Sequence, residues 1–142
     1  MSDQNKAAAK RFFELWEAHE VDKFDEVIAP DAIDHDPQRP FPDEHGPEAA
    51  RKTAEMFLAA FPDTKYTIEQ QIAEGDLVTT RWTARGTQSG ELMGIPPSGR
   101  SVEVTGTVID RFSDGKITES WGNWDTMGLL QQLGAVPETQ AA

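Results

Sequence analysis

Cysteine is missing from this chain, which excludes disulfide bonds, thiolate metal ligands and a thiol nucleophile. Long apolar runs are missing too, since the longest are far too short to cross a bilayer. The N-terminal segment has no apolar stretch followed by a small-residue cleavage site, so no secretion signal is visible. These absences predict a protein that does not interact with membranes and resides in the cytoplasm.

Basic residues are also few. Thirteen Lys and Arg stand against 25 Asp and Glu, which gives a formal net charge of −12. Nucleic-acid binding normally needs a clustered basic surface, and the basic residues here are scattered, so that class of function is excluded. We interpret the acidic excess as a feature that keeps the protein soluble.

One domain is expected for residues 1–142, because no repeat, low-complexity tract or linker divides them. Apolar residues recur at helical spacing in the first half of the chain and alternate in the second half. The predicted helices cover about 3–19, 22–27, 47–61 and 127–133. The predicted strands cover 64–72, 77–87, 102–112 and 117–125, with a short extended segment at 32–36.

This order of elements indicates an α+β fold with helices packed on one face of a curved antiparallel or mixed sheet. A sheet curled around helices makes a cone, and the mouth of the cone is a natural pocket. The proline-rich segment 37–46 is predicted to be a loop at the rim of that pocket, or a lid over it.

The segment from Val102 to Asp125 reads as a β-hairpin around a turn at 113–116. If Phe112 lies opposite Ile117, antiparallel partners face the same way and one face collects most of the bulky apolar side chains, so we expect it to look inward. Its predicted members are Val104, Gly106, Val108, Asp110, Phe112, Ile117, Glu119, Trp121, Asn123 and Asp125. Three of them are carboxylates, which are costly among apolar groups unless they are paired, hydrogen-bonded or functional.

Several motifs resemble those of the SnoaL-like polyketide cyclases. These proteins share a cone-shaped α+β fold with nuclear transport factor 2 and ketosteroid isomerase. The resemblance covers nearly the whole chain and is specific for fold and family. It rests on AFPD at 60–63, RWTARGT at 81–87, GIPPSG at 94–99, RFSDGKI at 111–117, Glu119, Trp121, Asp125 and GLLQQLG at 128–134.

The resemblance implies an enzyme that closes a ring by an intramolecular aldol reaction on an apolar, polyketide-type carbonyl substrate, without metal or cofactor. In the family, a carboxylate near the end of the last strand acts as general acid/base with the help of a histidine. Asp125 matches the place of that carboxylate and also falls on the predicted inward face. The alternative for Asp125 is a cap at the start of the closing helix.

The second catalytic candidate is His35, because histidine has the unperturbed pKa nearest neutrality. Its segment resembles the place where ketosteroid isomerases carry a catalytic aspartate followed by proline, matched here by Asp36-Pro37. In an extended segment only one of His35 and Asp36 points into the cavity. We expect His35 to do so, because it shares a side with the apolar Ile33.

Asp110 is the third catalytic candidate, since it matches the protonated aspartate of the isomerase oxyanion hole. The isomerase's partner tyrosine falls at Phe12, so half of that apparatus is missing. Asp110 and Glu119 are predicted to lie opposite each other and to share a proton. Alternatively, Arg81 or Arg85 neutralises one of the two.

An aromatic pocket wall suits a flat, apolar small-molecule substrate. Many members of the family carry histidine after the Gly86-Thr87 pair, whereas this chain has Gln88, which cannot transfer a proton near neutral pH. The predicted substrate-binding residues are Phe12, Trp16, Phe57, Trp82, Gln88, Met93, Trp121 and Asn123.

The opposite face of the hairpin is rich in threonine and includes a tryptophan, which indicates a covered interface. Relatives pair through this face, so the resemblance implies a homodimer. The predicted members of the face are Thr105, Thr107, Ile109, Ser120 and Trp124.

Two other functions stay open. A limonene-type epoxide hydrolase uses an Asp-Arg-Asp set to activate water, and Asp110, Asp125 and Arg81 supply those residue types. A binding module would hold an apolar ligand without turnover, and its acidic residues would then be structural. No metal site is expected, because the sequence does not bring together two or three ligands of the kinds that metals need.

Overall fold

The computed structural model describes residues 2–136, and its element order confirms the predicted α+β class. The helices are α1 (Ser2–Glu17), the 3₁₀ helix η1 (Val21–Glu26), α2 (Gly46–Ala60) and α3 (Thr126–Gln132). The strands are β1 (Ile28–Asp34), β2 (Lys65–Glu74), β3 (Leu77–Thr87), β4 (Ser101–Ser113) and β5 (Lys116–Trp124). Within residues 2–136, no helix has both the length and the apolar character needed to span a membrane.

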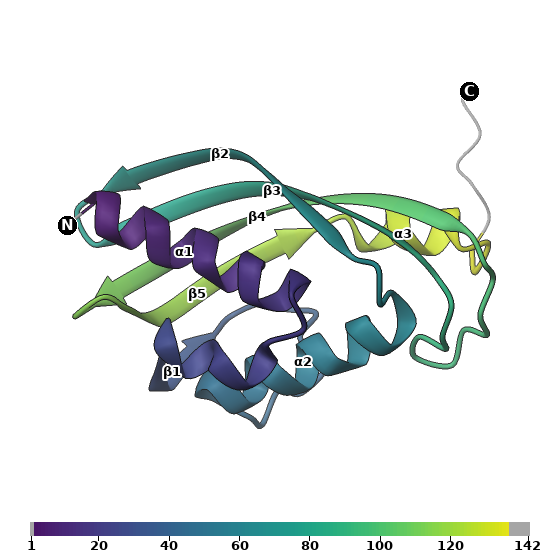
Figure 1. Cartoon of the computed structure of the whole chain (residues 1–142), viewed down its shortest axis with the longest axis horizontal. Helices are drawn as coiled ribbons and strands as arrows, with labels where there is room; N and C mark the ends of the chain where they lie inside the picture. Colours follow the sequence, from purple (N-terminus) through teal and green to yellow (C-terminus); the bar gives the residue numbers. More distant parts are fainter. Residues whose placement is uncertain (1, 137–142) are drawn as a thin grey trace.

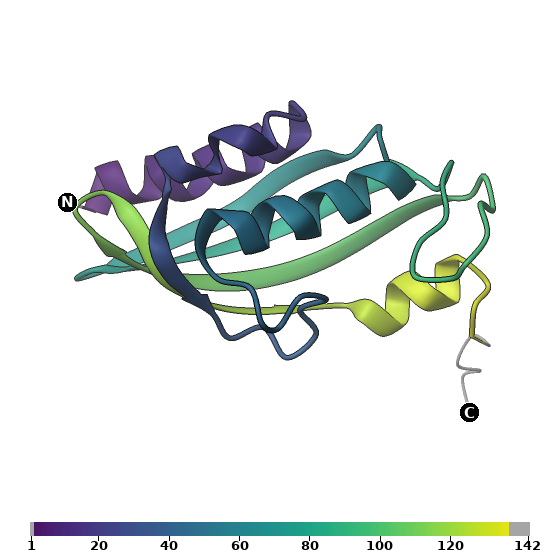
Figure 2. The same cartoon turned by 90° about the horizontal axis from the view of Figure 1, so that it is seen from below.

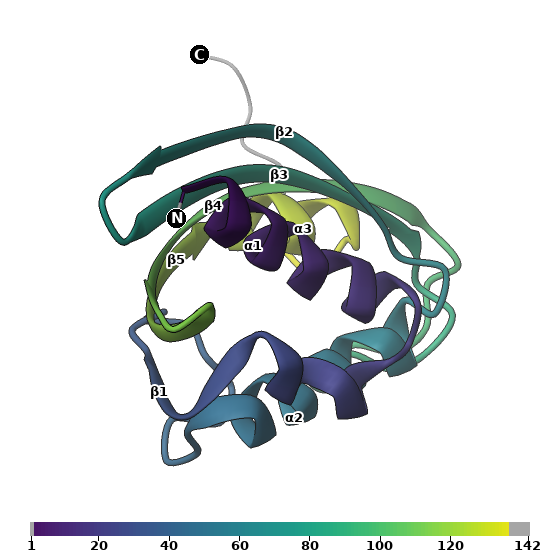
Figure 3. The same cartoon turned by 60° about the vertical axis from the view of Figure 1, so that its left-hand side comes forward.

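The five strands form one open, mixed sheet in the order β1-β5-β4-β3-β2. β1 runs parallel to β5, and the other neighbours pair antiparallel. The sheet curves, and α1, η1 and α2 lie on its concave side (Figures 1 and 3). α3 follows β5 at the far end of the sheet (Figure 2). Side chains on the concave face are therefore enclosed by helices, whereas the convex face is open.

The start of α2 depends on a glycine and a proline. Pro47 occupies the first turn, where its missing N–H costs nothing. Gly46 has a positive φ of 64°, and a Cβ there would lie 2.2 Å from the carbonyl oxygen of Pro30. Only glycine fits this close approach, which brings the start of α2 against Pro30 of β1.

β1 begins at Ile28, four residues before the extended segment that we predicted at 32–36. The prediction used Pro30 as the end of the preceding helix and began the extended segment after it. In the structure, the pairing of β1 with β5 is interrupted between Ile28 and Ile33. Pro30 lies within this irregular stretch of an edge strand, where its missing N–H is tolerated.

The hairpin of β4 and β5 departs from the predicted register. Phe112 pairs with Ile117 as expected, but Arg111 then pairs with Glu119. Thr118 is left without a partner in the ladder, which is a β-bulge.

The bulge shifts every later pair of the hairpin by one residue, so that Asp110 lies opposite Ser120 rather than Glu119. A slip of one residue turns each following side chain to the other face of the sheet. The predicted inward face is therefore right for β4 and wrong for β5 beyond Ile117. The inward residues of this part of β5 are Ser120, Gly122 and Trp124, whereas Glu119 and Trp121 face outward.

Two groups of buried apolar side chains make up the core. One lies where α1, η1 and β1 meet, around Leu15 and Phe24. The other lies near α3, around Phe61, Val104 and Leu129. The pocket described below borders both groups, so the core also forms its walls.

Candidate active site

A cavity of about 260 Å³ opens between the concave face of the sheet and the helices. Its wall is mostly apolar and aromatic, as expected for a site that takes a small apolar molecule. Four of the predicted substrate-binding side chains contribute to it: Phe12, Trp16, Phe57 and Trp82. Asn123, which is exposed, also borders the cavity.

Aromatic rings in the wall contact one another mainly edge to face. Tyr66 packs perpendicular to Trp16 at 5.9 Å between centroids and to Trp82 at 5.6 Å. Phe57 packs against Trp124 at 5.9 Å, so Trp124 lies inside rather than on the predicted outer face. Burial raises the pKa of the Tyr66 hydroxyl, which therefore remains protonated.

Trp16 leaves a polar atom unused in this wall. Its indole Nε1 is buried and has no hydrogen-bond partner within residues 2–136. A buried N–H without an acceptor is costly, so an acceptor oxygen on a bound molecule would stabilise it.

A row of polar side chains crosses three strands on the concave face. Asp34 of β1 pairs with Ser120 of β5, and Ser120 pairs with Asp110 of β4. The Ser120 hydroxyl donates a hydrogen bond of 2.6 Å to Oδ1 of Asp110. All three residues line the cavity.

Asp110 is the most deeply buried carboxyl group of this row, with only 4% of its surface exposed. Burial raises the pKa of Asp110 to about 7, and the nearby Asp34 acts in the same direction. The hydrogen bond from Ser120 opposes the shift without cancelling it. At neutral pH, Asp110 is therefore present in both its protonated and its ionised form.

Asp36 lies beside this row. Its Oδ2 is 3.7 Å from the position that a Cβ on Gly122 would occupy, so the carboxyl group fills space left by the glycine. Ser120 and Gly122 are successive inward positions of β5, roughly 7 Å apart, so the carboxyl groups of Asp110 and Asp36 lie next to neighbouring positions on the same face. Burial raises the pKa of Asp36, Asp34 adds to the shift, and a backbone hydrogen bond from Gln38 opposes it.

Asp125 does not line the cavity. Its Oδ1 accepts a hydrogen bond of 2.9 Å from the backbone N–H of Gly128, which makes it the N-cap of α3. The geometry thus matches the alternative that we considered for Asp125, and a catalytic role for it stays a prediction without support from its position.

His35 also lies outside the cavity, on the convex side of the sheet. It does share a side with Ile33, but Ile33 pairs with the outward Glu119 and is 47% exposed, although it also borders the cavity. Our expectation that His35 would point inward is therefore wrong, and Asp36 lines the cavity instead. The misleading signal was Ile33, whose apolar side chain suggested an inward face.

Glu119 and Trp121 lie on the same outer side as His35. Nε2 of His35 is 2.8 Å from Oε2 of Glu119, and Trp121 stacks on the imidazole. The charge of Glu119 is balanced by Arg111, at 3.0 Å, rather than by Arg81 or Arg85 as we had considered. The predicted pairing of Glu119 with Asp110 does not occur.

Gln88 is fully buried but does not line the cavity, contrary to prediction. Its side chain donates to the carbonyl of Ile95 at 3.2 Å and accepts from the N–H of Ser98 at 3.1 Å. Gln88 therefore fixes the connection between β3 and β4 from within. Met93, in that connection, is 57% exposed and also lies outside the cavity lining.

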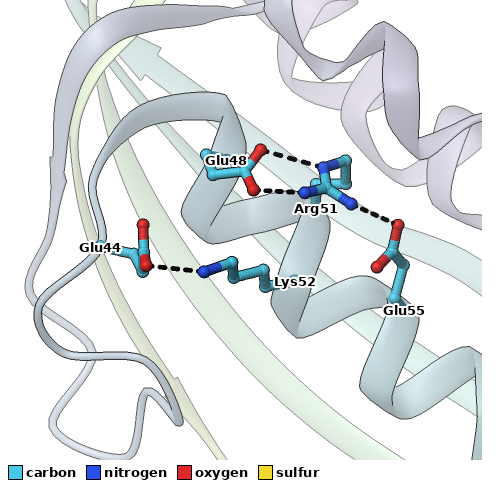
Figure 4. A network of polar contacts seen from close by, with 5 residues as sticks. All are labelled: Glu44, Glu48, Arg51, Lys52 and Glu55. Carbon is cyan, nitrogen blue, oxygen red and sulfur yellow. Dashed lines mark hydrogen bonds and ion pairs between the residues drawn. The ribbon is translucent and has the colours of Figure 1, made fainter.

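The predicted rim loop at 37–46 does border the cavity, through Glu44 and His45. Figure 4 shows how polar contacts fasten this loop to α2. Nζ of Lys52 donates to Glu44 at 2.6 Å, while Arg51 binds both Glu48 and Glu55 along the helix. These pairs stabilise the side of α2 from which the rim loop enters.

No group of three or more potential metal ligands gathers anywhere in residues 2–136. The sequence did not single out four residues that the structure brings to the cavity: Asp34, Tyr66, Ser120 and Trp124. A signal for Ser120 and Trp124 was available, since the opposite charges of Arg111 and Glu119 favour their direct cross-strand pairing and hence the bulge.

Comparison with known proteins agrees with this geometry. The family model "SnoaL-like polyketide cyclase" matches residues 6–133. Aklanonic acid methyl ester cyclase DnrD of Streptomyces peucetius is 29% identical over 110 residues, which cover 77% of this chain and 72% of DnrD.

Two solved structures extend the likeness. AclR of Streptomyces galilaeus, described as a candidate hydroxylase, superposes with a TM-score of 0.86 and 28% identity over 99% of this chain and 87% of its own. IdmH of Streptomyces antibioticus, described as a candidate polyketide cyclase, superposes with a TM-score of 0.81 and 36% identity over 92% of this chain and 99% of its own. The chain belongs to the SnoaL-like polyketide cyclase family.

Proposed function

We propose that the protein is a cofactor-independent cyclase that closes a carbon ring in an apolar, polyketide-type carbonyl substrate by an intramolecular aldol reaction. Membership of a family of cyclases supports the enzyme class. The observation that carries the chemistry is the pair of carboxyl groups, Asp36 and Asp110, in one apolar cavity. General acid/base catalysis needs a group that takes a proton and another that gives one.

In this mechanism, Asp36 acts as the base. Its ionised carboxylate removes a proton from the carbon beside a substrate carbonyl, which leaves an enolate. The enolate carbon attacks a second carbonyl carbon of the same molecule, and the new carbon–carbon bond pushes the carbonyl electrons onto oxygen. Asp36 suits this role because it is less buried than Asp110 and receives a backbone hydrogen bond from Gln38 that favours its charged form.

Asp110 acts as the acid. Its protonated form donates a proton to the oxygen that becomes a hydroxyl group. The proton held by Asp36 returns to Asp110 through solvent after the product leaves, so no other reactant is consumed. A pKa of about 7 suits this exchange, because an efficient catalytic group titrates near the working pH.

The charges on the cavity wall favour an uncharged substrate. Four carboxyl groups line it, on Asp34, Asp36, Glu44 and Asp110. Arg85 also borders it, but its side chain pairs with Glu103 on the convex side at 2.7 Å. An anionic substrate would be repelled. A neutral ester with ring or chain carbonyls would instead contact the aromatic wall and offer an oxygen to Nε1 of Trp16.

The test is turnover by Asp110→Asn and Asp36→Asn on a panel of polyketide methyl esters that includes aklanonic acid methyl ester. Each variant is expected to lose turnover while the exposed Asp31→Asn control on β1 keeps it. Full activity in both site variants would refute the mechanism. Tight ligand binding with no turnover by the parent protein would favour the binding-module alternative.

The epoxide hydrolase alternative finds less support. Arg81 is exposed and donates to Gln70, Asp125 caps α3, and only Asp110 of the proposed set lines the cavity. The three groups needed to activate water are therefore not together.

We also propose a homodimer through the convex sheet face. Ser120 and Trp124 turn inward and leave this surface, but Trp121 joins it opposite Ile109. Ile109 is 38% exposed, which suits an interface residue. Light scattering should give twice the chain mass, and Ile109→Glu should give the mass of one chain.

A further inference from the structure

The end of β1 presents its side chains alternately to the two sides of the sheet. Ala32, Asp34 and Asp36 line the cavity. Ile33, which pairs with the outward Glu119, and His35 lie on the convex side and are exposed, although Ile33 also borders the cavity. In the sequence, His35 thus lies between Asp34 and Asp36, but its ring lies on the opposite side of the sheet from their carboxyl groups.

β1 is an edge strand, because it pairs with β5 alone. Its regular pairing with β5 is interrupted between Ile28 and Ile33, and resumes only for Ile33 and Asp34. Beyond Asp34, the backbone N–H of His35 donates to the carbonyl of Ser120 at 2.8 Å, and the chain then leaves the sheet. Such a strand end frays unless side chains hold it.

His35 makes two further contacts with β5. Its Nε2 is 2.8 Å from Oε2 of Glu119, and its ring stacks on Trp121 with 5.2 Å between centroids and 17° between planes. Together with the backbone bond, these contacts hold His35 to three consecutive residues of β5, 119–121.

The partners of His35 are themselves held. Arg111 of β4 binds Glu119 at 3.0 Å and places its guanidinium 5.4 Å from the centre of the Trp121 ring. Arg111 also lies 3.5 Å from Asp76 in the turn between β2 and β3. His35 therefore binds to side chains of β5 that are already held in place by Arg111, which in turn contacts the turn between β2 and β3.

On the cavity side, the backbone after His35 carries Asp36. The N–H of Asp36 donates to Oδ1 of Asp34 at 2.9 Å, and the N–H of Gln38 donates to Oδ1 of Asp36 at 2.8 Å. These local bonds set the turn but do not attach it to the sheet. The attachment to β5 nearest to Asp36 is His35.

We propose that His35 is a positioning residue that fastens the end of β1 from outside and thereby holds the Asp36 carboxyl group over Gly122 in the cavity. The inference rests on the proposed function only for its catalytic consequence. The placement of Asp36 is measurable without any substrate.

A plain surface ion pair would act differently. Exposed ion pairs contribute little to stability and influence no distant group. A positioning role instead predicts that loss of His35 changes the environment of Asp36 on the other side of the sheet. The charged groups that bear on Asp36 are Asp34 on its own segment and Arg39 in the following loop, while Glu44, His45 and Asp110 line the same cavity.

The experiment is a carbon-13 NMR titration of the aspartate carboxyl groups in His35→Ala, with Asp36 and Asp110 assigned from their Asn variants. The pKa of Asp36 is expected to fall to its usual range of about 4, because the freed carboxyl group reaches water. The pKa of Asp110, which is fixed by β4 and Ser120, should stay raised and so report an intact fold. Turnover should fall about tenfold, with kcat changing more than KM.

Three companion variants complete the test. Glu119→Ala removes the same anchor from the β5 side and should reproduce the effect, which also covers a failure of His35→Ala to fold. His35→Gln retains a donor for Glu119 and should restore the titration of Asp36 in part. Glu103→Gln breaks the Arg85–Glu103 pair elsewhere on the convex side and should leave Asp36 unchanged.

An Asp36 titration that is the same in the parent, His35→Ala and Glu119→Ala would overturn the inference. A failure of the proposed function looks different: Asp36→Asn would keep full turnover, whatever the titration of Asp36 in the His35 variant. The two results are independent, so each can fail without the other.

Discussion

Glu119 and Ser120 are neighbours in β5, yet they belong to opposite environments. On the convex side, Glu119 receives a hydrogen bond from His35 and lies beside Arg111, and these partners lower the pKa of Glu119. On the concave side, Ser120 serves Asp110, whose pKa is raised by burial. The direction of each shift follows from the surroundings and not from the type of residue.

The comparison separates structural from catalytic carboxyl groups. An acid that is exposed and paired with cations stays ionised and contributes to the surface. An acid that is buried among aromatic rings, with a serine as its direct partner, keeps a proton that it can transfer. Because successive side chains of a strand point to opposite faces, neighbouring residues in the sequence can belong to these two different environments.

The largest expected effect is on catalysis. Its absence would remove the distinction between Asp110 as a catalytic acid and Glu119 as a structural one. Asp110→Asn and Asp36→Asn should each lower kcat by about 10²–10⁴-fold, because each removes a proton-transfer group. The pH profile of the parent should decline on the acid side as Asp36 is protonated and on the alkaline side as Asp110 ionises with a pKa of about 7. In Asp110→Asn the residual activity should lose the alkaline decline, as measured by kcat/KM between pH 5 and 9.

The second effect concerns the pH dependence of the free energy of unfolding, which distinguishes Asp110 from the carboxyl groups on the convex side. Its pKa is raised from 3.8 to about 7 on folding, so the folded state binds the proton more tightly than the unfolded state. Stability therefore decreases as pH rises from about 4 to 7, and the full cost is present above pH 7. Relative to Asp110→Asn, the parent should lose about 3 kcal/mol of unfolding free energy between pH 5 and pH 8.

Urea denaturation of both proteins at the two pH values measures this difference. Glu103→Gln, on the convex side, provides the comparison, and its unfolding free energy should follow that of the parent at both pH values. A parent and an Asp110→Asn variant with parallel pH dependence would mean that Asp110 does not retain its proton on folding.

A smaller effect is expected at Asp125, the acid that the sequence favoured most. Asp125→Ala should cost about 1 kcal/mol of unfolding free energy, because it removes the cap of α3. Asp125→Asn keeps a capping oxygen and should retain both stability and turnover. Loss of turnover in a stable Asp125→Asn would restore the original prediction that Asp125 is the general acid/base.

The smallest effect is expected at Trp16 in the wall facing the acids. Trp16→Phe removes the unpartnered Nε1 and should raise KM about fivefold with kcat unchanged, since the bond to substrate oxygen contributes equally in the ground and transition states. Steady-state kinetics on the same ester panel measures the split. An unchanged KM would mean that no substrate oxygen reaches this N–H.

Sequence reasoning predicted the fold well because the fold depends on periodicity, which a single chain displays. The shift from helical to alternating spacing near Thr64, and the turn at 113–116, placed most elements within a few residues. The pocket aromatics on α1, α2 and β3 followed for the same reason. Their side chains point where a regular helix or strand must send them.

The candidate site was less predictable because it depends on irregularities. Asp125, the expected catalytic acid, occupies the position of a helix cap, and the two roles share one residue type at one place in the chain. The choice of His35 over Asp36 rested on the apolar character of Ile33, which is in fact exposed. Edge strands of an open sheet carry apolar residues on either side, so hydrophobicity alone does not orient them.

The bulge at Thr118 has a consequence for how such a gene can change. Deleting that single codon would leave a hairpin with uninterrupted pairing, in which Glu119 still lies opposite Arg111 and Ser120 opposite Asp110. Inserting one codon between Ser120 and Trp121 would instead turn Gly122 and Trp124 out of the cavity and bring Trp121 and Asn123 into it. The bulge is therefore a place where β5 can lose a residue without exchanging its two faces, and an insertion or deletion screen should find the loss of a codon better tolerated at Thr118 than an insertion at residues 120–124.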